Sequence, residues 1–310
     1  MLTDTTIGSA TPALSVVIAC TDARRTIAAC LRSITSACEG VNAEVIVVDA
    51  SADGTADIAR TDGLIKVIGM PRGTLTPRLW AAGLAQARGR AVAFTIGQCQ
   101  VGAEWARALL AGLESGATGA GGAMQPAESC GPVDWAIFYL RYSAFLGAGE
   151  REVEPAVEIP GDNAAYRGDA LQRHASSFAD GFWEVDFHRR VRAEGARLVF
   201  MPGAEARFGP AAPLLSLARQ RFAHGRHSGA WRIATGVRSS WQVIAAAPAV
   251  PVLLTLRIAR RVLARRADRV RFLSAVPALL LLACAWAAGE AWGAVAAARP
   301  VMVRTPSLAV

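Results

Sequence analysis

Short apolar runs rich in β-branched residues alternate with helical patterns in the N-terminal part of the chain, and this alternation constrains the fold most. The strand-like runs are residues 14–19, 43–49, 66–68 and 91–94. Helical patterns lie between them, most clearly at residues 26–36 and 76–88. This order is typical of a parallel sheet with helices on both faces, so we expect an α/β fold.

The second run ends abruptly in a carboxylate and a turn, in the sequence AEVIVVDASADGT at residues 43–55. Ligands of open α/β sheets bind where strands end, which makes Asp49 a candidate binding residue. Asp53 is open to two interpretations. It is either a short acceptor that caps the helix expected from Thr55, or a ligand contact.

Composition excludes some classes of protein and leaves others open. The 310 residues allow one large domain plus an appendage, and the six cysteines show no short paired spacing that would indicate a zinc cluster or a disulfide framework. The net charge of +8 decides little, because Lys66 is the single lysine and the other basic residues are arginines. Residues 1–12 form a polar tail without a secretory pattern, so we expect the catalytic part in the cytoplasm.

The C-terminal region, from residue 231 to 310, becomes basic and apolar. Residues 243–256 are apolar but interrupted by prolines, residues 257–271 carry seven arginines, and residues 272–289 are 18 residues without a charge. A membrane-spanning helix needs roughly 20 apolar residues. We therefore expect residues 272–297 to be the better spanning candidate and residues 243–256 to lie in the interface or to re-enter it.

The arginine-rich segment should stay on the cytoplasmic side of a membrane. Ile258, Val262 and Val270 are predicted to share one side of a helix, with the arginines against anionic headgroups. The alternatives are a buried helical hairpin on a soluble domain and helices that bind a partner. Nucleic acid is a poorer fit, because aromatic residues are not interleaved with the arginines.

Four segments occur in an informative order: LSVVIA at 14–19, VDASADGT at 48–55, AVAFTIGQC at 91–99 and GFWEVDFHRR at 181–190. Together they resemble the family 2 glycosyltransferases of the GT-A fold, over residues 14 to about 230. The resemblance implies a GT-A domain at residues 13–230, with an open, mostly parallel sheet, followed by membrane-associated helices.

The resemblance also implies an activity. The expected enzyme takes a sugar from a nucleotide-diphospho-sugar, most often a UDP-sugar, and inverts the anomeric centre by direct displacement. The adjoining basic and apolar segments favour a lipid-linked or cell-envelope polysaccharide acceptor and a location at the cytoplasmic membrane. Two alternatives stay open: a catalytically silent GT-A domain that binds a nucleotide-sugar or a partner, and a membrane-anchored nucleotide-binding protein without sugar chemistry.

Several donor-binding residues follow from this resemblance. Asp22 and Asp49 would line the pocket for the base and ribose, where a carboxylate accepts hydrogen bonds from a uracil N–H or a ribose hydroxyl. Arg78 lies where family members often place a basic residue near the nucleotide. A solvated arginine on a helix face is the alternative interpretation of Arg78.

The sequence departs from the family at the fourth strand. Members usually carry an Asp-x-Asp there to hold Mg²⁺ or Mn²⁺ on the diphosphate, whereas this chain has Ile96-Gly97-Gln98. Isoleucine cannot bind a metal, and glutamine is a weaker ligand than a carboxylate for such cations. Gln98 is expected among the substrate-binding residues. Either arginines such as Arg221 and Arg226 neutralise the diphosphate, or the domain no longer transfers sugar. Lipid headgroups are the alternative partner of these arginines.

The catalytic base is expected in the segment 181–190. On the family pattern Glu184 takes the position of the base, with Asp186 as runner-up, and a structural ion pair with a nearby arginine is the alternative role. Asp162 and Asn163 resemble residues that meet the donor sugar and the acceptor. An Asp-Asn pair is also what a turn selects by backbone chemistry alone.

Overall fold

The computed structural model describes residues 11–147, 153–210 and 212–298, so nearly all of the predicted tail at 1–12 lies outside the described residues. The chain divides into two compact units. The sheet unit comprises residues 1–134 and 141–212, and the helical unit comprises residues 135–140 and 213–310. This division falls before the predicted domain limit at residue 230.

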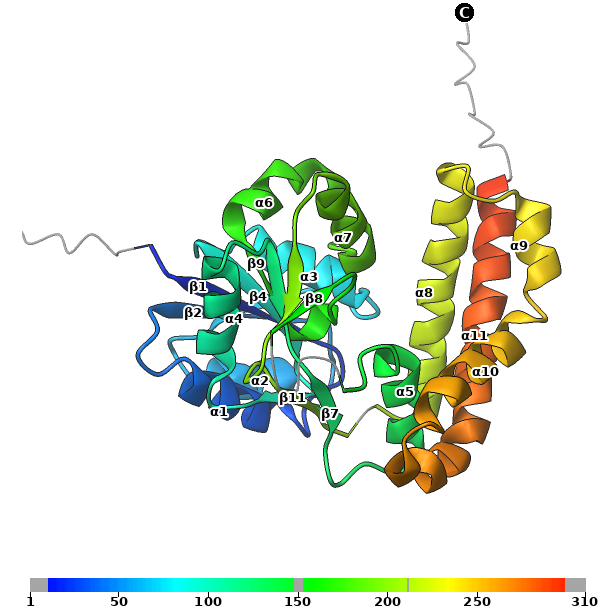
Figure 1. Cartoon of the computed structure of the whole chain (residues 1–310), viewed down its shortest axis with the longest axis horizontal. Coiled ribbons are helices and arrows are strands. Elements are labelled where there is room, and N and C mark those ends of the chain that lie inside the picture. The colour runs from blue at the N-terminus through cyan, green and yellow to red at the C-terminus, as the bar shows by residue number, and fades with distance from the viewer. Residues whose placement is uncertain (1–10, 148–152, 211, 299–310) are drawn as a thin grey trace, which may run out of the picture. The chain divides into compact units, whose positions relative to one another are not determined.

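The sheet unit contains an eight-stranded sheet in the order β3-β2-β1-β4-β9-β6-β10-β8 (Figure 1). Its strands are β1 (Leu14–Cys20), β2 (Ala43–Asp49), β3 (Lys66–Gly69), β4 (Ala91–Ile96), β6 (Gly119–Gly121), β8 (Glu154–Ala156), β9 (Ala164–Arg167) and β10 (Leu198–Phe200). The first four in this order are parallel, as their near-continuous apolar sequences predict. β9 and β8 are antiparallel to their neighbours. The mixed α/β class expected from the sequence is confirmed.

A second, three-stranded sheet has the order β5-β11-β7. It consists of β5 (Cys99–Val101), β7 (Met124–Pro126) and β11 (Ala206–Phe208). Asn163 stabilises the connections that lead into it. Its side chain Nδ2 donates to the carbonyls of Ala123 at 3.1 Å and Ala204 at 2.8 Å, and its Oδ1 accepts from Trp105 Nε1 at 2.7 Å.

Helices cover both faces of the large sheet. The sheet unit contains α1 (Ile27–Ala37), α2 (Thr55–Arg60), α3 (Thr76–Leu84), α4 (Trp105–Glu114), the end of α5 (Pro132–Tyr142), α6 (Gly168–Arg173) and α7 (Glu184–Ala193), with 3₁₀ turns η1 (Gly161–Asn163) and η2 (Ala175–Phe178). A Cβ on Gly83 of α3 would lie 2.3 Å from Val17. Cys20 lies on the side of α1, because a Cβ on Gly97 would lie 2.8 Å from Cys20 Sγ and 3.6 Å from Cδ1 of Ile27, the first residue of α1. Residues 17 and 20 point to opposite faces of a strand, so α1 and α3 lie on opposite faces.

The helix predicted at residues 76–88 is shorter than expected, because α3 ends at Leu84 and a turn carries the chain into β4. Gly89 explains the turn: a Cβ there would lie 2.5 Å from the backbone nitrogen of Ser15. The backbone therefore approaches β1 closely just before β4 begins, and a continuing helix would not allow this approach.

The helical unit contains α8 (Leu214–Ala234), α9 (Ser240–Ala246), α10 (Val250–Val262), the 3₁₀ turn η3 (Arg266–Asp268) and α11 (Arg269–Ala298). α8 and α11 pack side by side (Figure 1). Four glycines make this contact close, because added Cβ atoms would lie within 2.2 Å of backbone carbonyls on the facing helix. These glycines are Gly225 and Gly229 of α8 and Gly289 and Gly293 of α11.

The stretch Arg266–Ala298 is long and apolar enough to cross a membrane, as judged by length and composition alone. α9 and α10 meet at a 63° bend and together form a broken apolar segment. One expectation about this region was wrong. Ile258 and Val262 are buried on α10, but Val270 is 79% exposed on α11, since η3 breaks the predicted helix between them.

Candidate active site

Asp49 and Asp22 meet at the carboxyl edge of the parallel strands. Asp49 ends β2 in register with Cys20, the last residue of β1, and is 5% exposed. Its Oδ1 accepts hydrogen bonds from the backbone N–H of Ser51 at 3.2 Å and from the Ser51 hydroxyl at 2.5 Å. The Ser51 hydroxyl in turn accepts from the N–H of Asp22 at 2.8 Å. The structure thus joins the two predicted base and ribose contacts through one serine.

Asp53 organises the turn that follows. Its Oδ1 accepts from the N–H of Thr55 at 3.0 Å and from the Thr55 hydroxyl at 2.5 Å, and its Oδ2 accepts from the N–H of Arg24 at 3.1 Å. Short acceptors at a helix start satisfy free amide hydrogens in this way. The geometry favours the capping interpretation of Asp53 over a ligand contact.

Gln98 links the turn after β4 to the turn after β1. Its Nε2 donates to the carbonyl oxygen of Thr21 at 2.9 Å, next to Asp22. β1 and β4 are parallel neighbours, so their ends lie at the same edge of the sheet. Asp22, Asp49 and Gln98, three of the predicted substrate-binding residues, are therefore brought together.

The turn η1 lies at this same edge. β9 runs antiparallel to β4 and pairs Ala164 with Phe94, so the residues that precede β9 lie beside the end of β4. Asp162 is 3% exposed and accepts hydrogen bonds from the Arg141 guanidinium and the Tyr142 hydroxyl. Burial lowers the pKa of Arg141, but the negative charges around it, with Asp162 the largest contributor, together outweigh burial and hold that pKa above its usual value.

Asn163 has a different environment from its neighbour. It is fully buried, and both hydrogens of its side-chain amide are used on backbone carbonyls of the protein. The turn-and-packing interpretation therefore fits Asn163 better than a sugar contact. The predicted sugar contact of Asp162 stays a prediction. Its partners Arg141 and Tyr142 were missed by the sequence analysis.

Buried aromatic rings hold the segment that carries Glu184. The Phe182 ring stacks on Phe94 with centroids 4.5 Å apart, and Phe187 meets Tyr166 edge-on at 5.3 Å. Phe182 and Phe187 flank Glu184 in sequence and are almost fully buried. Their packing fixes the first turn of α7 against the sheet.

Glu184 is the first residue of α7 and packs against η1. A Cβ on Gly161 would lie 2.7 Å from the Glu184 Cγ, so the glycine leaves room for this side chain next to Asp162. Desolvation raises the pKa of the Glu184 carboxyl above its ordinary value. Within the described residues Glu184 makes no ion pair. The predicted role of Glu184 as the catalytic base stays a prediction.

Asp186 is the runner-up for the catalytic base. It forms ion pairs with nearby arginines, which is the alternative role that the sequence analysis named. Its carboxylate lies 2.5 Å from Arg189 Nη2 and 2.7 Å from Arg190 Nε, one turn along the same helix. These contacts hold both carboxylate oxygens on the surface of α7. The local geometry therefore favours Glu184 over Asp186 as the base.

A buried chain of polar groups lies one helical turn from Glu184. His188 is fully buried, with its Nδ1 2.5 Å from Glu158 Oε2 and its Nε2 2.7 Å from the Tyr166 hydroxyl. The sequence analysis missed these residues. The spacing of four between Glu184 and His188 was the available signal, whereas nothing in the sequence indicated that Glu158 and Tyr166 would meet His188.

Arg78 connects α3 to the loop that leads to Glu184. Its guanidinium lies 3.6 Å from the Asp180 carboxylate, and its Nε donates to the Asp180 carbonyl at 3.4 Å. Gly181 has a φ of 122° and closely approaches the backbone of Pro77, which a side chain would prevent. Arg78 is exposed, and its predicted contact with the nucleotide stays a prediction.

Arg221 and Arg226 lie on α8 and belong to the helical unit. Arg226 is exposed, and the Arg221 guanidinium carbon lies 5.5 Å from the Trp286 ring centroid. Their predicted role at the donor diphosphate stays a prediction.

A family model described as glycosyl transferase family 2 matches residues 15–174, which is more than half of the chain. The chain belongs to this family. Among solved structures, S. aureus TarS is 16% identical with a TM-score of 0.47, and the match covers 67% of this chain and 38% of that one. TarS 1–349 is 13% identical with a TM-score of 0.49, covering 87% and 89%. No curated protein matches the sequence.

This family 2 glycosyltransferase domain lacks the usual metal ligands at the end of β4. Ile96 is apolar and 4% exposed, and Gln98 directs its amide nitrogen to a carbonyl oxygen. No group of three or more His, Cys, Asp or Glu side chains that could hold a metal ion occurs within residues 11–147, 153–210 and 212–298. The residues at this turn therefore do not fit the divalent cation that the family usually binds here.

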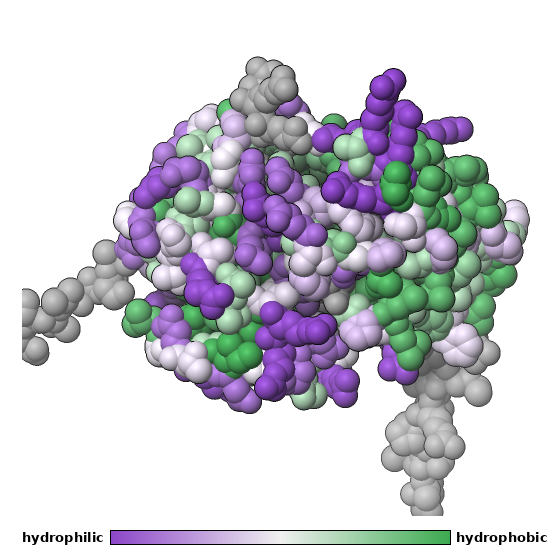
Figure 2. All heavy atoms as spheres, turned by 90° about the horizontal axis from the view of Figure 1, so that it is seen from below, coloured by the Kyte–Doolittle hydropathy of each residue, from purple (hydrophilic) through white to green (hydrophobic). Residues whose placement is uncertain are grey.

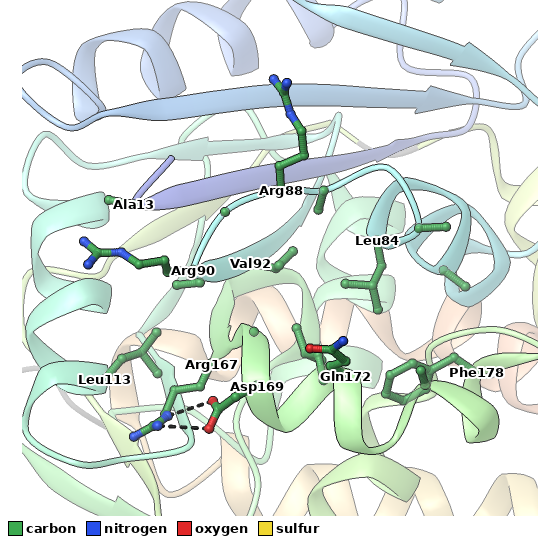
Figure 3. Close-up of a pocket in the computed structure, with 18 of the residues that line it drawn as sticks. Ala13, Leu84, Arg88, Arg90, Val92, Leu113, Arg167, Asp169, Gln172 and Phe178 are labelled. Atoms are coloured by element: carbon green, nitrogen blue, oxygen red, sulfur yellow. Dashed lines mark hydrogen bonds and ion pairs between the residues drawn. The ribbon is translucent and has the colours of Figure 1, made fainter. Parts of the chain in front are cut away.

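A cavity of about 1010 Å³ lies at the opposite edge of the sheet (Figure 3). Ala13, Ala91 and Arg167 line it, at the start of β1, near the start of β4 and at the end of β9. Figure 3 shows Arg167 paired with Asp169, at 3.0 Å. None of the predicted site residues lines this cavity. Ligands of such sheets usually bind at the carboxyl ends of the strands, which is the other edge, and donor binding at the Asp49 edge stays a prediction.

Proposed function

We propose that the chain is an inverting glycosyltransferase that moves a sugar from a nucleotide-diphospho-sugar to a lipid-linked or cell-envelope polysaccharide acceptor. One observation carries the proposal. In a family 2 domain, Asp49 lies at the same edge of one sheet as the turn η1, against which Glu184 packs. β2 and β9 are three positions apart, or roughly 14 Å. An extended nucleotide-sugar can bridge such a distance, with its base at Asp49 and its sugar near Asp162.

In the proposed reaction, an acceptor hydroxyl attacks the anomeric carbon from the side opposite the diphosphate. Glu184 takes the hydroxyl proton as the new carbon–oxygen bond forms, and the bond from the anomeric carbon to the diphosphate oxygen breaks. The raised pKa of Glu184 suits this role, because a more basic carboxylate accepts a proton more readily. Asp162, fixed by Arg141 and Tyr142, would orient the sugar hydroxyls.

A catalytically silent domain is the second candidate, and the Ile96-Gly97-Gln98 turn favours it. Titration of the purified full chain with UDP, GDP and their sugars, with and without Mn²⁺, separates the candidates. Binding followed by turnover supports the transferase. Binding with no turnover on any acceptor supports the silent domain, and the absence of nucleotide binding in every condition contradicts both.

Replacing Asp49 by Asn should weaken nucleotide binding by about tenfold to a hundredfold, because a hydrogen bond to a charged group contributes about 1.5–3 kcal/mol. Isothermal calorimetry with UDP or GDP measures the change. Asp57→Asn is the matched control, since Asp57 is an exposed carboxylate on α2 that pairs with Arg60. Equal affinities in both variants would place the nucleotide elsewhere.

A membrane location at the cytoplasmic face is part of the proposal. Exposed apolar side chains on α10 and α11 support it, among them Val252, Leu253, Leu256 and Leu273, each at least 53% exposed. Leu253→Glu should reduce flotation of the full chain with lipid vesicles. Leu64→Glu should not, because Leu64 is an exposed leucine of the sheet unit. Equal flotation of both variants would contradict insertion through α10.

A further inference from the structure

An open cavity of about 490 Å³ lies within the helical unit, among α8, α9, α10 and α11. It combines cationic and apolar walls. The lining residues are Leu140, Arg221, Arg232, Arg238, Val243, Ala246, Val250, Leu253, Leu254, Arg257, Trp286 and Glu290. None of them belongs to the predicted donor pocket except Arg221.

The cavity has an excess of positive charge. Four arginines face one carboxylate, Glu290, which is 5% exposed and lies 3.0 Å from Arg232 Nε. The Ser228 hydroxyl also donates to Glu290, at 3.3 Å. Arg238 and Arg257 form no ion pair within the described part of the chain. Guanidinium groups arranged in this way suit a phosphate, which they bind through paired hydrogen bonds.

The apolar wall continues onto the exposed surface of the helical unit. Val243, Val250 and Leu254 line the cavity, and Leu253, which also lines it, is 63% exposed. Figure 2 shows a broad hydrophobic surface over the helical unit with strongly hydrophilic residues at its border. A ligand with a phosphate head and an apolar chain matches both parts of this site.

The packing of α8 on α11 sets the depth of the cavity in a membrane. The close glycine contacts keep the two helices together, so α8 must lie at the same depth in a bilayer as α11. α8 carries four arginines, and each would cost about 2.5–3.5 kcal/mol at the bilayer centre. The helical unit is therefore better placed at the level of the headgroups, where lipid phosphates lie, than across the hydrocarbon core.

We infer that this cavity binds the phosphate group of a membrane lipid. The inference shares with the proposed function the requirement that the helical unit meets a membrane, but it needs no sugar transfer. The lipid is either a bilayer phospholipid or a lipid phosphate that serves as acceptor, because both present the same group to the arginines.

Native mass spectrometry of the purified full chain in detergent, without nucleotide, tests the inference. The probes are phosphatidylglycerol, a polyprenyl monophosphate, diacylglycerol and inorganic phosphate. Arg238→Gln/Arg257→Gln should weaken binding of the phosphate lipid by about tenfold or more. Arg260→Gln/Arg261→Gln is the matched control, since it removes the same charge from exposed positions of α10 outside the cavity and should leave binding unchanged.

Glu290→Gln provides a test of opposite sign. It removes the negative charge of the cavity and should strengthen binding of the phosphate lipid, an outcome that loss of structure would not produce. Preferential binding of phosphatidylglycerol identifies a bilayer lipid, and preferential binding of the polyprenyl phosphate identifies an acceptor. Binding of diacylglycerol to the same extent, binding of inorganic phosphate alone, no binding, or equal loss in both double variants would overturn the inference.

Discussion

Replacing Glu184 by Gln lowers kcat by about 10²- to 10⁴-fold and leaves the affinity for the nucleotide-sugar nearly unchanged, if Glu184 is the base. Glutamine keeps the shape of the side chain against Gly161 but cannot accept the proton of the acceptor hydroxyl. Turnover of a nucleotide-sugar measures kcat, and calorimetry with the nucleotide measures binding. Asp186→Asn is the control, because Asp186 is engaged with Arg189 and Arg190.

The pH dependence provides a second readout of the same prediction. A base acts in its deprotonated form, so kcat/KM should rise with pH through the pKa of Glu184, which desolvation raises above the ordinary 4.5. The acid limb should therefore lie at higher pH than for an exposed glutamate, and it should be absent from any residual activity of Glu184→Gln. Full activity in this variant would move the role of base to Asp186.

Replacing Arg141 by Met should lower the free energy of unfolding by about 3 kcal/mol, because it leaves the buried carboxylate of Asp162 without its charged partner. The Asp162 side chain is 4% exposed and the Arg141 side chain 26% exposed, so water compensates little. Tyr142 keeps one hydrogen bond to Asp162 but supplies no charge. Denaturant unfolding of the full chain, followed by fluorescence, measures the loss.

The double variant Arg141→Met/Asp162→Asn distinguishes a buried charge from lost packing. Removing both charges should restore a substantial part of the stability, because no uncompensated charge remains. Arg173→Met is the matched control: Arg173 also pairs with an aspartate, Asp169, but both side chains are at least half exposed. Its effect should be within about 1 kcal/mol. Equal losses in Arg141→Met and the double variant would assign the effect to packing.

Local sequence patterns were sufficient to predict the parallel strands and the polar residues at their carboxyl ends. Asp49 was identified because a buried run ends at a carboxylate, and parallel strands necessarily bring such ends to one edge. That Gln98 lies beside Asp22 became clear only from the structure, in which its side chain bonds to Thr21. Local patterns failed for Val270, because η3 interrupts a helix whose periodicity appeared continuous in the sequence.

The partners of the site residues come from distant segments and could not be predicted in this way. Arg141 reaches Asp162 from α5, across 21 positions, and Glu158 meets His188 across 30. No periodicity links such residues, because their contact depends on how helices pack on the sheet. The choice between Glu184 and Asp186 also depended on this packing, which places one carboxylate against η1 and the other beside two arginines.

By itself, the sequence determined the class of fold and the family, and it predicted the edge of the sheet where a donor would bind, because these follow from short-range patterns of apolar and polar residues. Tertiary structure alone decided which charges are paired, which carboxylate is desolvated and that four arginines of the helical unit share one cavity. The physical reason is that pairing and desolvation depend on the distance between groups in space, and separation along the chain does not specify that distance.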